Sequence, residues 1–138
     1  MALLEVKNLY KEYPIMRGVL RKKVGAVFAL NGVDLTIHEG QFVAVVGESG
    51  CGKSTLAKAV IRLIEPSGGT IIFDGKTVLD RKDRRKIQMV FQDPFSSLDP
   101  RKKVREALIE PLLYHEPKMS PDEAIHKAKV VLERVGLS

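Results

Sequence analysis

Eight consecutive residues, 47–54, have the types and the spacing of a loop that binds phosphate. They read GESGCGKS and satisfy the pattern G-x-x-x-x-G-K-[ST]. The three glycines permit backbone conformations that other residues avoid, so that successive N–H groups can converge on one anion. We expect Glu48 and Cys51 to contribute their backbone rather than their side chains. The expected nucleotide-binding backbone comprises Gly47, Glu48, Ser49, Gly50, Cys51 and Gly52.

Three side chains at the end of this loop extend the same chemistry. Lys53 offers a mobile positive charge to the β- and γ-phosphates. One such contact at ~4 Å contributes of order 4 kcal/mol before desolvation, if the effective dielectric is near 20. The Ser54 hydroxyl is an oxygen ligand of the kind that Mg²⁺ prefers, and Thr55 is expected to hydrogen-bond near the α-phosphate. The alternatives are a glycine-rich turn that binds nothing and, for Cys51, a redox role.

A strand before the loop and a helix after it must hold these groups in place. QFVAVV (41–46) is a continuous apolar run, which is typical of a strand buried on both faces. A helix is expected from about Lys53 to Ile64, and the segment EPSGG ends it. The N-terminus of that helix adds unsatisfied N–H groups and about half a positive charge. The loop therefore reads as the turn of a strand–loop–helix unit.

The rest of the first hundred residues is rich in β-type segments. LLEVKNLY (3–10) and AVFALNGVDLTIHEG (26–40) mix apolar and polar residues at short spacing and predict strands. TIIFDGKTVL (70–79) predicts a hairpin that turns at Asp74-Gly75-Lys76. IQMVFQ (87–92) is one further candidate strand.

The last forty residues have helical spacing instead. KKVREALIEPLLYH (102–115) and SPDEAIHKAKVVLERVGL (120–137) each predict a helix. Ser120, Pro121 and Glu123 fit the N-cap, N1 and N3 positions of a capping box. Gly136 fits the position that follows a helix C-terminus. The expected apolar face of this helix consists of Ala124, Ala128, Val131 and Val135.

Composition sets the class of protein but names no partner. Hydrophobic residues make up 44% and charged residues 29% of 138 residues, which fits one globular domain. The single Cys51 cannot form an internal disulfide, which favours a reducing compartment. The net charge of +6 comes largely from RGVLRKK (17–23), RKDRRK (81–86) and RKKVR (101–105). Since aromatic residues are only 6% and do not interleave with these clusters, solvated surface charge is favoured over nucleic-acid binding.

The sequence following the loop resembles a known family. MVFQDPFSSLDPR (89–101) is similar to the Q-loop region of ATP-binding cassette (ABC) proteins. The whole chain resembles the ATPase subunits of bacterial and archaeal oligopeptide, dipeptide and nickel importers. The matching pieces are LLEVKNLYKEYP, RGVLRKKVGAVFALNGVDLTIHEG, VGESGCGKSTLAKAVIRLIEPSGGTIIFDGK and FQDPFSSLDPR. They cover nearly all of residues 3–101 in order.

The resemblance implies an α/β fold of the P-loop NTPase class. Residues 1–99 would hold an N-terminal antiparallel β-subdomain and the P-loop core, and residues 100–138 the start of a helical subdomain. ATP and Mg²⁺ are the implied ligands. Gln92 would be the Q-loop glutamine that reaches Mg²⁺ and the attacking water, so that Lys53 and Gln92 are the implied catalytic residues. Tyr13 lies where the family carries an aromatic ring that stacks on adenine, with Tyr10 and Phe28 as rivals.

The resemblance also implies partners and a location. The helical subdomain would contact permease subunits, and a second ABC ATPase subunit, either a copy or a paralogue, would complete the dimer at the cytoplasmic face of the membrane. No nucleic-acid partner is implied, and no role is implied for the three histidines, His38, His115 and His126.

The chain departs from the family pattern at its end, ERVGLS. The family places its LSGGQ signature, its Walker B carboxylates and its switch histidine beyond this point. We therefore expect an N-terminal fragment that binds nucleotide weakly and hydrolyses it negligibly. Strands QFVAVV and IQMVFQ would lack neighbours, so we expect self-association, rearrangement or a distorted phosphate loop.

Other functions remain open at the level of sequence. One is a soluble ABC-type ATPase that acts on nucleic acid or ribosomes, in which the basic clusters would matter. Another is a P-loop kinase or other phosphotransferase, although FQDPFSSLDP counts against it. A third is a binding or interaction module without catalysis.

Overall fold

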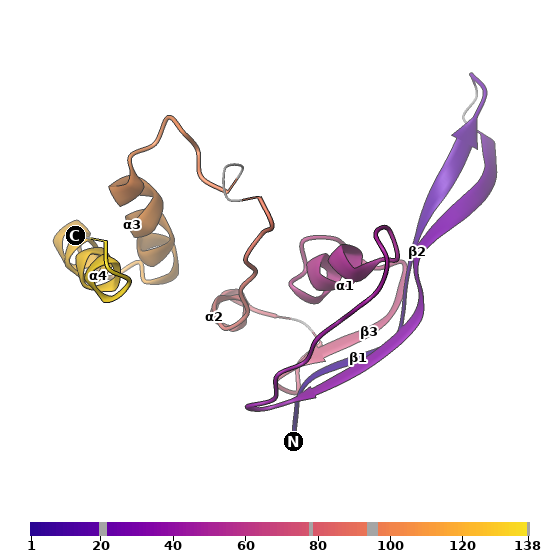
Figure 1. The fold of residues 1–138 in the computed structure, drawn as a ribbon, viewed down its shortest axis with the longest axis horizontal. Helices are drawn as coiled ribbons and strands as arrows, with labels where there is room; N and C mark the ends of the chain where they lie inside the picture. Colours follow the sequence, from indigo (N-terminus) through magenta and orange to yellow (C-terminus); the bar gives the residue numbers. More distant parts are fainter. Residues whose placement is uncertain (20–21, 78, 94–96, 138) are drawn as a thin grey trace. The chain divides into compact units, whose positions relative to one another are not determined.

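The computed structural model of the chain describes residues 1–19, 22–77, 79–93 and 97–137. Parts of the predicted basic insert, of the second hairpin segment and of FQDPFSSLDPR fall outside these residues. The chain forms two compact units, residues 1–89 and residues 90–138 (Figure 1). This division falls ten residues before the soft boundary near residue 99, and the assignment of subdomains to residues 1–99 and 100–138 stays a prediction.

A three-stranded antiparallel sheet dominates the first unit. Its strands are β1 (Ala2–Arg17), β2 (Lys22–His38) and β3 (Gly68–Phe73), in the order β2-β1-β3 (Figure 1). The predicted strands at 3–10 and 26–40 are confirmed. Both are longer than expected, because β1 and β2 continue into the basic segment as one hairpin that ends with Arg17 opposite Lys22.

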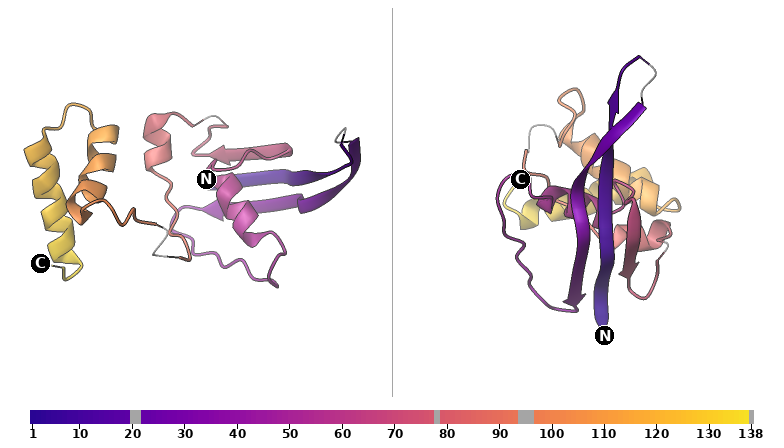
Figure 2. Two further views of the ribbon diagram at one scale, coloured as in Figure 1. Left: turned by 90° about the horizontal axis from the view of Figure 1, so that it is seen from above. Right: turned by 90° about the vertical axis from the view of Figure 1, so that its right-hand side faces the viewer.

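The core of the first unit lies between this sheet and helix α1 (Lys53–Val60), which covers one face of the sheet (Figure 2). Side chains alternate between the two faces of a strand, so that Leu4 and Val6 of β1 and Ile71 and Phe73 of β3 are buried as period-two pairs. The full buried cluster is Leu4, Val6, Leu9, Leu30, Leu56, Ala59, Ile71, Phe73 and Leu79.

The turn after β3 follows the sequence prediction. Asp74 and Gly75 have φ values of 49° and 74°, both in the left-handed region that a type I′ turn requires. Phe73 and Lys76 pair across the turn as an isolated antiparallel bridge. The predicted hairpin is thus confirmed at its first strand and turn.

Two predicted strands are absent. Residues 41–46 and 87–92 adopt no strand conformation, and the side chains of Phe42, Val46 and Val90 are 97%, 91% and 95% exposed. A strand is held by hydrogen bonds to a neighbouring strand, and neither segment pairs with β1, β2 or β3. The predictions of a strand buried on both faces at 41–46 and of a strand at 87–92 were therefore wrong.

A short helix, α2 (Arg81–Arg85), occupies the segment that we took only as a basic cluster. The Asp80 side chain accepts hydrogen bonds from the backbone N–H groups of Lys82 and Asp83 at 2.7 and 2.8 Å. The Asp83 carboxylate in turn accepts from the Asp80 N–H and from the Lys76 ammonium, the latter at 2.8 Å. Asp83 is 3% exposed, so this pair fixes α2 to the turn after β3.

The second unit is helical, as predicted, with α3 (Val104–His115) and α4 (Pro121–Arg134). The capping box at Ser120 and Glu123 is confirmed, and Gly136 has the left-handed φ of 78° expected after a helix C-terminus. Hydrogen bonds from the Ser120 backbone and hydroxyl lower the pKa of Glu123.

The predicted apolar face of α4 is only half right. Ala124 and Ala128 are buried, whereas Val131 and Val135 are 53% and 65% exposed. The stripe was read from helical spacing, but only its N-terminal half meets another part of the described chain.

Candidate phosphate-binding site

Helix α1 begins at Lys53, where the phosphate-loop pattern predicts it, and ends at Val60, four residues earlier than expected. Gly52 is its N-cap residue, with a φ of 98°, and its carbonyl accepts the first helical hydrogen bond, from the Leu56 N–H at 2.8 Å. None of the side chains that the structure describes caps this end of the helix, and its first turn carries no acidic residue. The first N–H groups of α1 therefore remain available to an anion.

Gly52 also fixes the loop against β2. A Cβ atom at Gly52 would lie 2.2 Å from the Ala29 carbonyl oxygen and 3.2 Å from a methyl carbon of Leu30. Lys11 of β1 pairs with Leu30 of β2, and the next residue, Glu12, pairs with Phe28. Ala29 is therefore an extra residue in β2, which marks a bulge. Both the left-handed φ and the close approach require glycine here.

Within the loop, the backbone folds tightly over Cys51. A Cβ atom at Gly47 would lie 2.7 Å from the Cys51 Sγ, and the Cys51 N–H donates to the Glu48 carbonyl at 3.3 Å. The Cys51 and Glu48 side chains are exposed. These contacts are compatible with binding through the backbone of Glu48 and Cys51. That role of the two residues stays a prediction.

The Lys53 ammonium points back across the loop. Its Nζ donates to the carbonyl oxygens of Gly47 and Glu48 at 2.5 and 2.6 Å and lies 3.4 Å from the Cys51 Sγ. Carbonyl groups orient the ammonium without neutralising it. No ion pair formed by the described residues involves Lys53, so its full charge adds to the positive end of α1.

Ser54 and Thr55 occupy the first turn of α1, and Ser54 is exposed while Thr55 is half-buried. Among the described residues, no group of three His, Cys, Asp or Glu side chains is placed to hold a metal. Ser54 is thus an exposed hydroxyl at the start of α1, and Ser49 is a second exposed hydroxyl within the loop. Hydroxyl oxygens with few other protein ligands are compatible with Mg²⁺, because Mg²⁺ keeps several waters and binds substrate phosphates.

Tyr13 lies on the hairpin that holds the loop. It is 47% exposed, and the Lys11 ammonium lies 5.2 Å from the centre of its ring. Tyr13 follows Lys11 by two residues on β1, so the two side chains share one face, and Lys11 pairs with the buried Leu30 beside Gly52.

The rivals of Tyr13 differ from it. The Tyr10 ring packs against the backbone of Gly68, where a Cβ atom would overlap it. Phe28 is 54% exposed and pairs with Glu12, so it faces away from Tyr13. Of the three rings, Tyr13 is the one that is both accessible and on the face of Leu30.

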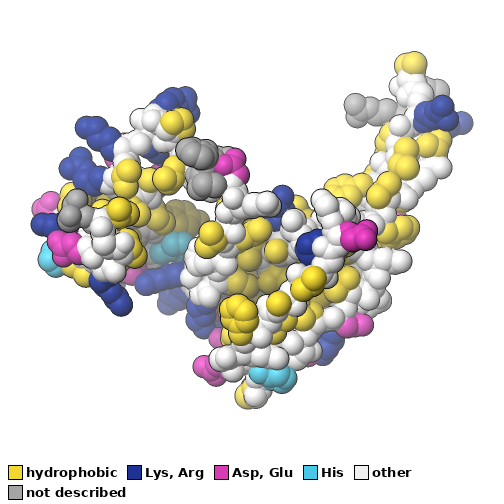
Figure 3. All heavy atoms as spheres, viewed as in Figure 1, with side chains coloured by type: hydrophobic (Ala, Val, Ile, Leu, Met, Phe, Trp, Pro, Cys, Tyr) yellow, Lys and Arg dark blue, Asp and Glu magenta, His cyan; other side chains and the backbone are white. Residues whose placement is uncertain are grey.

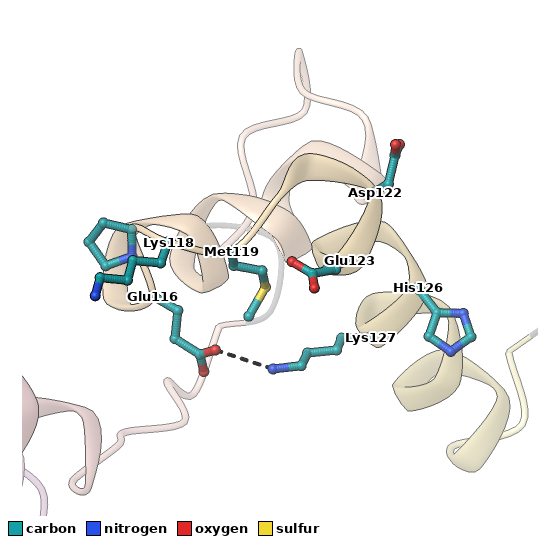
Figure 4. A pocket seen from close by; sticks show the side chains of 8 residues that line it. Glu116, Lys118, Met119, Asp122, Glu123, His126 and Lys127 are labelled. Atoms are coloured by element: carbon teal, nitrogen blue, oxygen red, sulfur yellow. Dashed lines mark hydrogen bonds and ion pairs between the residues drawn. The ribbon is translucent and has the colours of Figure 1, made fainter.

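Gln92 lies in the second unit, at an exposed bend. Its predicted approach to the metal and the attacking water therefore stays a prediction. Two hollows among the described residues are lined by no residue of the loop. One is lined by residues of the α3–α4 connection and α4, where Glu116 and Lys127 form a 3.2 Å ion pair (Figure 4). The other lies beside Arg62 and α2.

Two features near the site were not predicted from the sequence: the bulge in β2 and the contact between Lys11 and Tyr13. The bulge at Ala29 leaves no sequence signal, since it depends on the register of β1 against β2. The Lys11–Tyr13 contact, by contrast, follows from two residues spaced by two on a strand and could have been found.

Comparison with known proteins now identifies the family. The ABC transporter family model matches residues 30–138. The chain is 42% identical to the oligopeptide transport ATP-binding protein AppF of Bacillus subtilis, over 98% of the chain and 43% of that protein. It is 40% identical to the glutathione import ATP-binding protein GsiA of Escherichia coli K12, over 98% of the chain and 22% of that protein. The chain thus spans less than half the length of these curated relatives.

Solved structures agree with this assignment and confirm the predicted fold class. The ATP-binding cassette MJ0796, solved as a dimer with ADP and Pi, superposes with a TM-score of 0.76 at 29% identity, over 98% of the chain and 58% of that structure. The cbiO1 subunit of Clostridium perfringens, part of an ABC transporter complex, gives a TM-score of 0.67 at 28% identity, over 99% of the chain and 51% of that structure. The chain belongs to the ABC transporter family.

Proposed function

We propose that this chain is the ATP-binding part of the ATPase subunit of a peptide-class ABC importer. The observation that supports this most directly is the loop at 47–54. Gly52 lets the start of α1 pack closely against β2, and the Lys53 ammonium donates hydrogen bonds to the loop carbonyls of Gly47 and Glu48. The names of AppF, an oligopeptide transport ATP-binding protein, and of GsiA, a glutathione import ATP-binding protein, support the class of solute.

The chain's own residues would bind MgATP in the following way. The uncapped N–H groups of α1 and the loop backbone would hold the phosphates, and Lys53 would exchange one of its carbonyl contacts for the β- and γ-phosphate oxygens. Ser54 would ligate Mg²⁺, which neutralises phosphate charge when bound, and Thr55 would contact the α-phosphate region. Tyr13 would stack on adenine.

Coupling to transport is the wider part of the proposal. Gln92 would connect the metal and the attacking water to permease subunits at the cytoplasmic face of the membrane, and a second ATPase subunit would complete each site. None of the helices among the described residues is long and apolar enough to cross a membrane. On this proposal, transport depends on separate permease subunits.

The decisive test compares MgATP binding by wild type, Lys53→Ala and Lys58→Ala. Lys58 is an exposed lysine on the same helix and serves as the matched control. Because hydrogen bonds to charged groups contribute about 1.5–3 kcal/mol, we expect Lys53→Ala to weaken binding by at least about tenfold. Equal affinity of wild type and Lys53→Ala would refute the site.

Self-association of the chain is a separate proposal. The exposed apolar residues of 41–46 support it, because unpaired strand-like segments tend to pair with other copies. Light scattering tests it directly, and a monodisperse monomer would refute it.

A further inference from the structure

The β1–β2 hairpin extends well beyond the rest of its sheet. β3 pairs with β1 only from Leu4 to Tyr10, whereas β2 pairs with β1 as far as Arg17. From residue 13 to 19 and from residue 22 to 28 the hairpin therefore has no third strand beside it, and we call these two stretches the hairpin arm. It projects away from α1 and β3 in Figure 1.

The hairpin arm exposes many apolar side chains. Val19, in the turn, is fully exposed, and the others are about half exposed. A two-stranded ribbon cannot bury either of its faces by itself, so this apolar surface requires another partner. The exposed apolar residues of the arm are Tyr13, Ile15, Met16, Val19, Val24, Val27 and Phe28.

The same arm carries positive charge at its far end. Arg17 and Lys22 form the last described pair of the hairpin, and Lys23 follows opposite Met16. The sequence has no Asp or Glu from Tyr13 to Val33. Lys23 forms a 3.2 Å ion pair with Glu12, at the base of the arm, which leaves Arg17 and Lys22 without a described acidic partner. Figure 3 shows Lys and Arg side chains in dark blue near hydrophobic side chains in yellow at the far end of the arm.

This combination of charge and apolar surface distinguishes between classes of partner. A second copy would place like charges against each other, which is unfavourable. A nucleic acid would match the charge. At about 3.3 Å per residue, however, Tyr13 lies roughly 13 Å along its strand from Arg17, and Phe28 lies roughly 20 Å from Lys22. Aliphatic side chains surround the cations instead. An anionic lipid surface matches both properties, because it offers phosphate headgroups beside acyl chains.

We infer that the hairpin arm binds the surface of a bilayer that contains anionic lipids. Val19, Met16 and Val24 enter the boundary between headgroups and acyl chains, and Arg17 and Lys22 bind lipid phosphates. Long cationic side chains extend their stems along apolar surface while their charged ends stay at the headgroups. The inference does not rest on nucleotide binding, since the residues assigned to lipid include neither Tyr13 nor any residue of loop 47–54.

The first experiment measures binding of the full chain to sedimented vesicles of phosphatidylcholine mixed with phosphatidylglycerol, at low salt. Each Lys or Arg near such a surface contributes about fivefold in affinity, so we expect Arg17→Gln/Lys22→Gln to weaken binding roughly 25-fold. The matched control, Arg105→Gln/Lys118→Gln, removes the same charge from exposed positions of the second unit and should retain wild-type binding. Equal loss in both double variants, or equal binding to pure phosphatidylcholine vesicles, would overturn the inference.

A second experiment reports insertion directly. The chain contains no Trp, so Val19→Trp introduces a single fluorophore at a fully exposed position that should not disturb the fold. We expect its emission to move to shorter wavelength with anionic vesicles, whereas Val131→Trp on α4, which is 53% exposed in the wild type, should not respond. An unchanged Val19→Trp spectrum would overturn insertion.

Two further measurements separate this inference from other outcomes. Lys53→Ala, which tests the nucleotide site, should bind vesicles as wild type does, so failure of one proposal is distinguishable from failure of the other. Salt-sensitive binding of a single-stranded DNA oligonucleotide that needs Arg17 and Lys22, without vesicle binding, would assign the arm to nucleic acid and overturn the lipid inference.

Discussion

β3 and the segment 41–46 are alike in sequence and opposite in structure. β3 reads GGTIIF and the segment reads QFVAVV, six residues each, rich in β-branched and aromatic side chains. In β3, Ile71 and Phe73 are 2% and 6% exposed. In the segment, Phe42 and Val46 are 97% and 91% exposed, and no strand forms.

The difference lies in what each segment has beside it. β3 pairs with β1 through five register positions and rests against the side chains of α1. The segment 41–46 has no strand beside it among the described residues, and its backbone cannot supply its own hydrogen-bond partners. An apolar, β-branched run therefore specifies a strand only where a partner strand completes it.

The largest expected effect compares one buried and one exposed aliphatic residue of these two segments. We expect Ile71→Ala to cost about 2–5 kcal/mol in free energy of unfolding, because it leaves a cavity in the core. Val46→Ala should change it by no more than about 0.5 kcal/mol. Urea unfolding followed by circular dichroism measures both.

Amide hydrogen exchange provides an independent readout of the same contrast. Amides of β1 and β3 should be protected, while those of residues 42–46 should exchange at close to the rate of an unfolded peptide. A cost for Val46→Ala that matches the cost for Ile71→Ala, or strong protection across 42–46, would show that the segment is packed and would remove the contrast.

A smaller effect is expected where the chain after 41–46 rejoins the sheet. Gly52 and Gly50 both have positive φ, but a Cβ atom meets the Ala29 carbonyl at 2.2 Å only at Gly52, whereas at Gly50 nothing lies within 4 Å. Gly50→Ala should cost about 1 kcal/mol for its backbone conformation, and Gly52→Ala about 1–3 kcal/mol more for the clash. Thermal unfolding of the two variants checks this, and equal melting temperatures would mean that the loop does not contact β2 at Gly52.

These contrasts also explain how much the sequence could predict. The start of α1, the turn at Asp74-Gly75 and the cap at Ser120 depend on residues within one turn of each other, and all three are confirmed. The helix α2 had such a signal too, since Asp80 and Asp83 stand at N-cap and N3, but we did not use it. The exposure of 41–46 and of Val135 could not be predicted, because it depends on which parts of the chain meet.

The candidate site divides in the same way. The pattern at 47–54 locates the loop and the start of α1, because glycine conformations and the position of Lys53 are local. The carbonyl contacts of Lys53 and the packing of Gly52 against β2 could not be predicted from the pattern, because they depend on the three-dimensional fold. Tyr13 was located by resemblance, and its accessibility on the face of Leu30 required the register of the hairpin.

A locally determined helix should respond to loss of its cap. The Ser120 hydroxyl accepts a hydrogen bond from the Glu123 N–H at 3.2 Å, so Ser120→Ala should destabilise the second unit by about 1 kcal/mol. Ser120→Asp, which retains a cap, should restore most of it. If both variants have the melting temperature of the wild type, then α4 is stabilised by packing rather than by its cap. Like β3, it would then depend on its neighbours.

The smallest expected effect concerns the ion pair that holds α2 to the turn after β3. The hydrogen bond from Lys76 lowers the pKa of Asp83, with a second contribution from the Asp80 N–H, and the same pair raises the pKa of Lys76. An acid with a lowered pKa in the folded state stabilises the fold above its ordinary pKa of 3.8, and this stabilisation is lost as pH falls through the lowered value. A lysine with a raised pKa stabilises the fold below 10.5, and its contribution is lost as pH rises beyond that value. The difference in melting temperature between wild type and Asp83→Asn should therefore be constant near neutral pH and shrink in acid and in strong base. The ion pair between Asp83 and Lys76 joins α2 to the turn after β3. If the difference in melting temperature does not shrink in acid, this ion pair contributes nothing to stability. The attachment of α2 would then depend on other contacts.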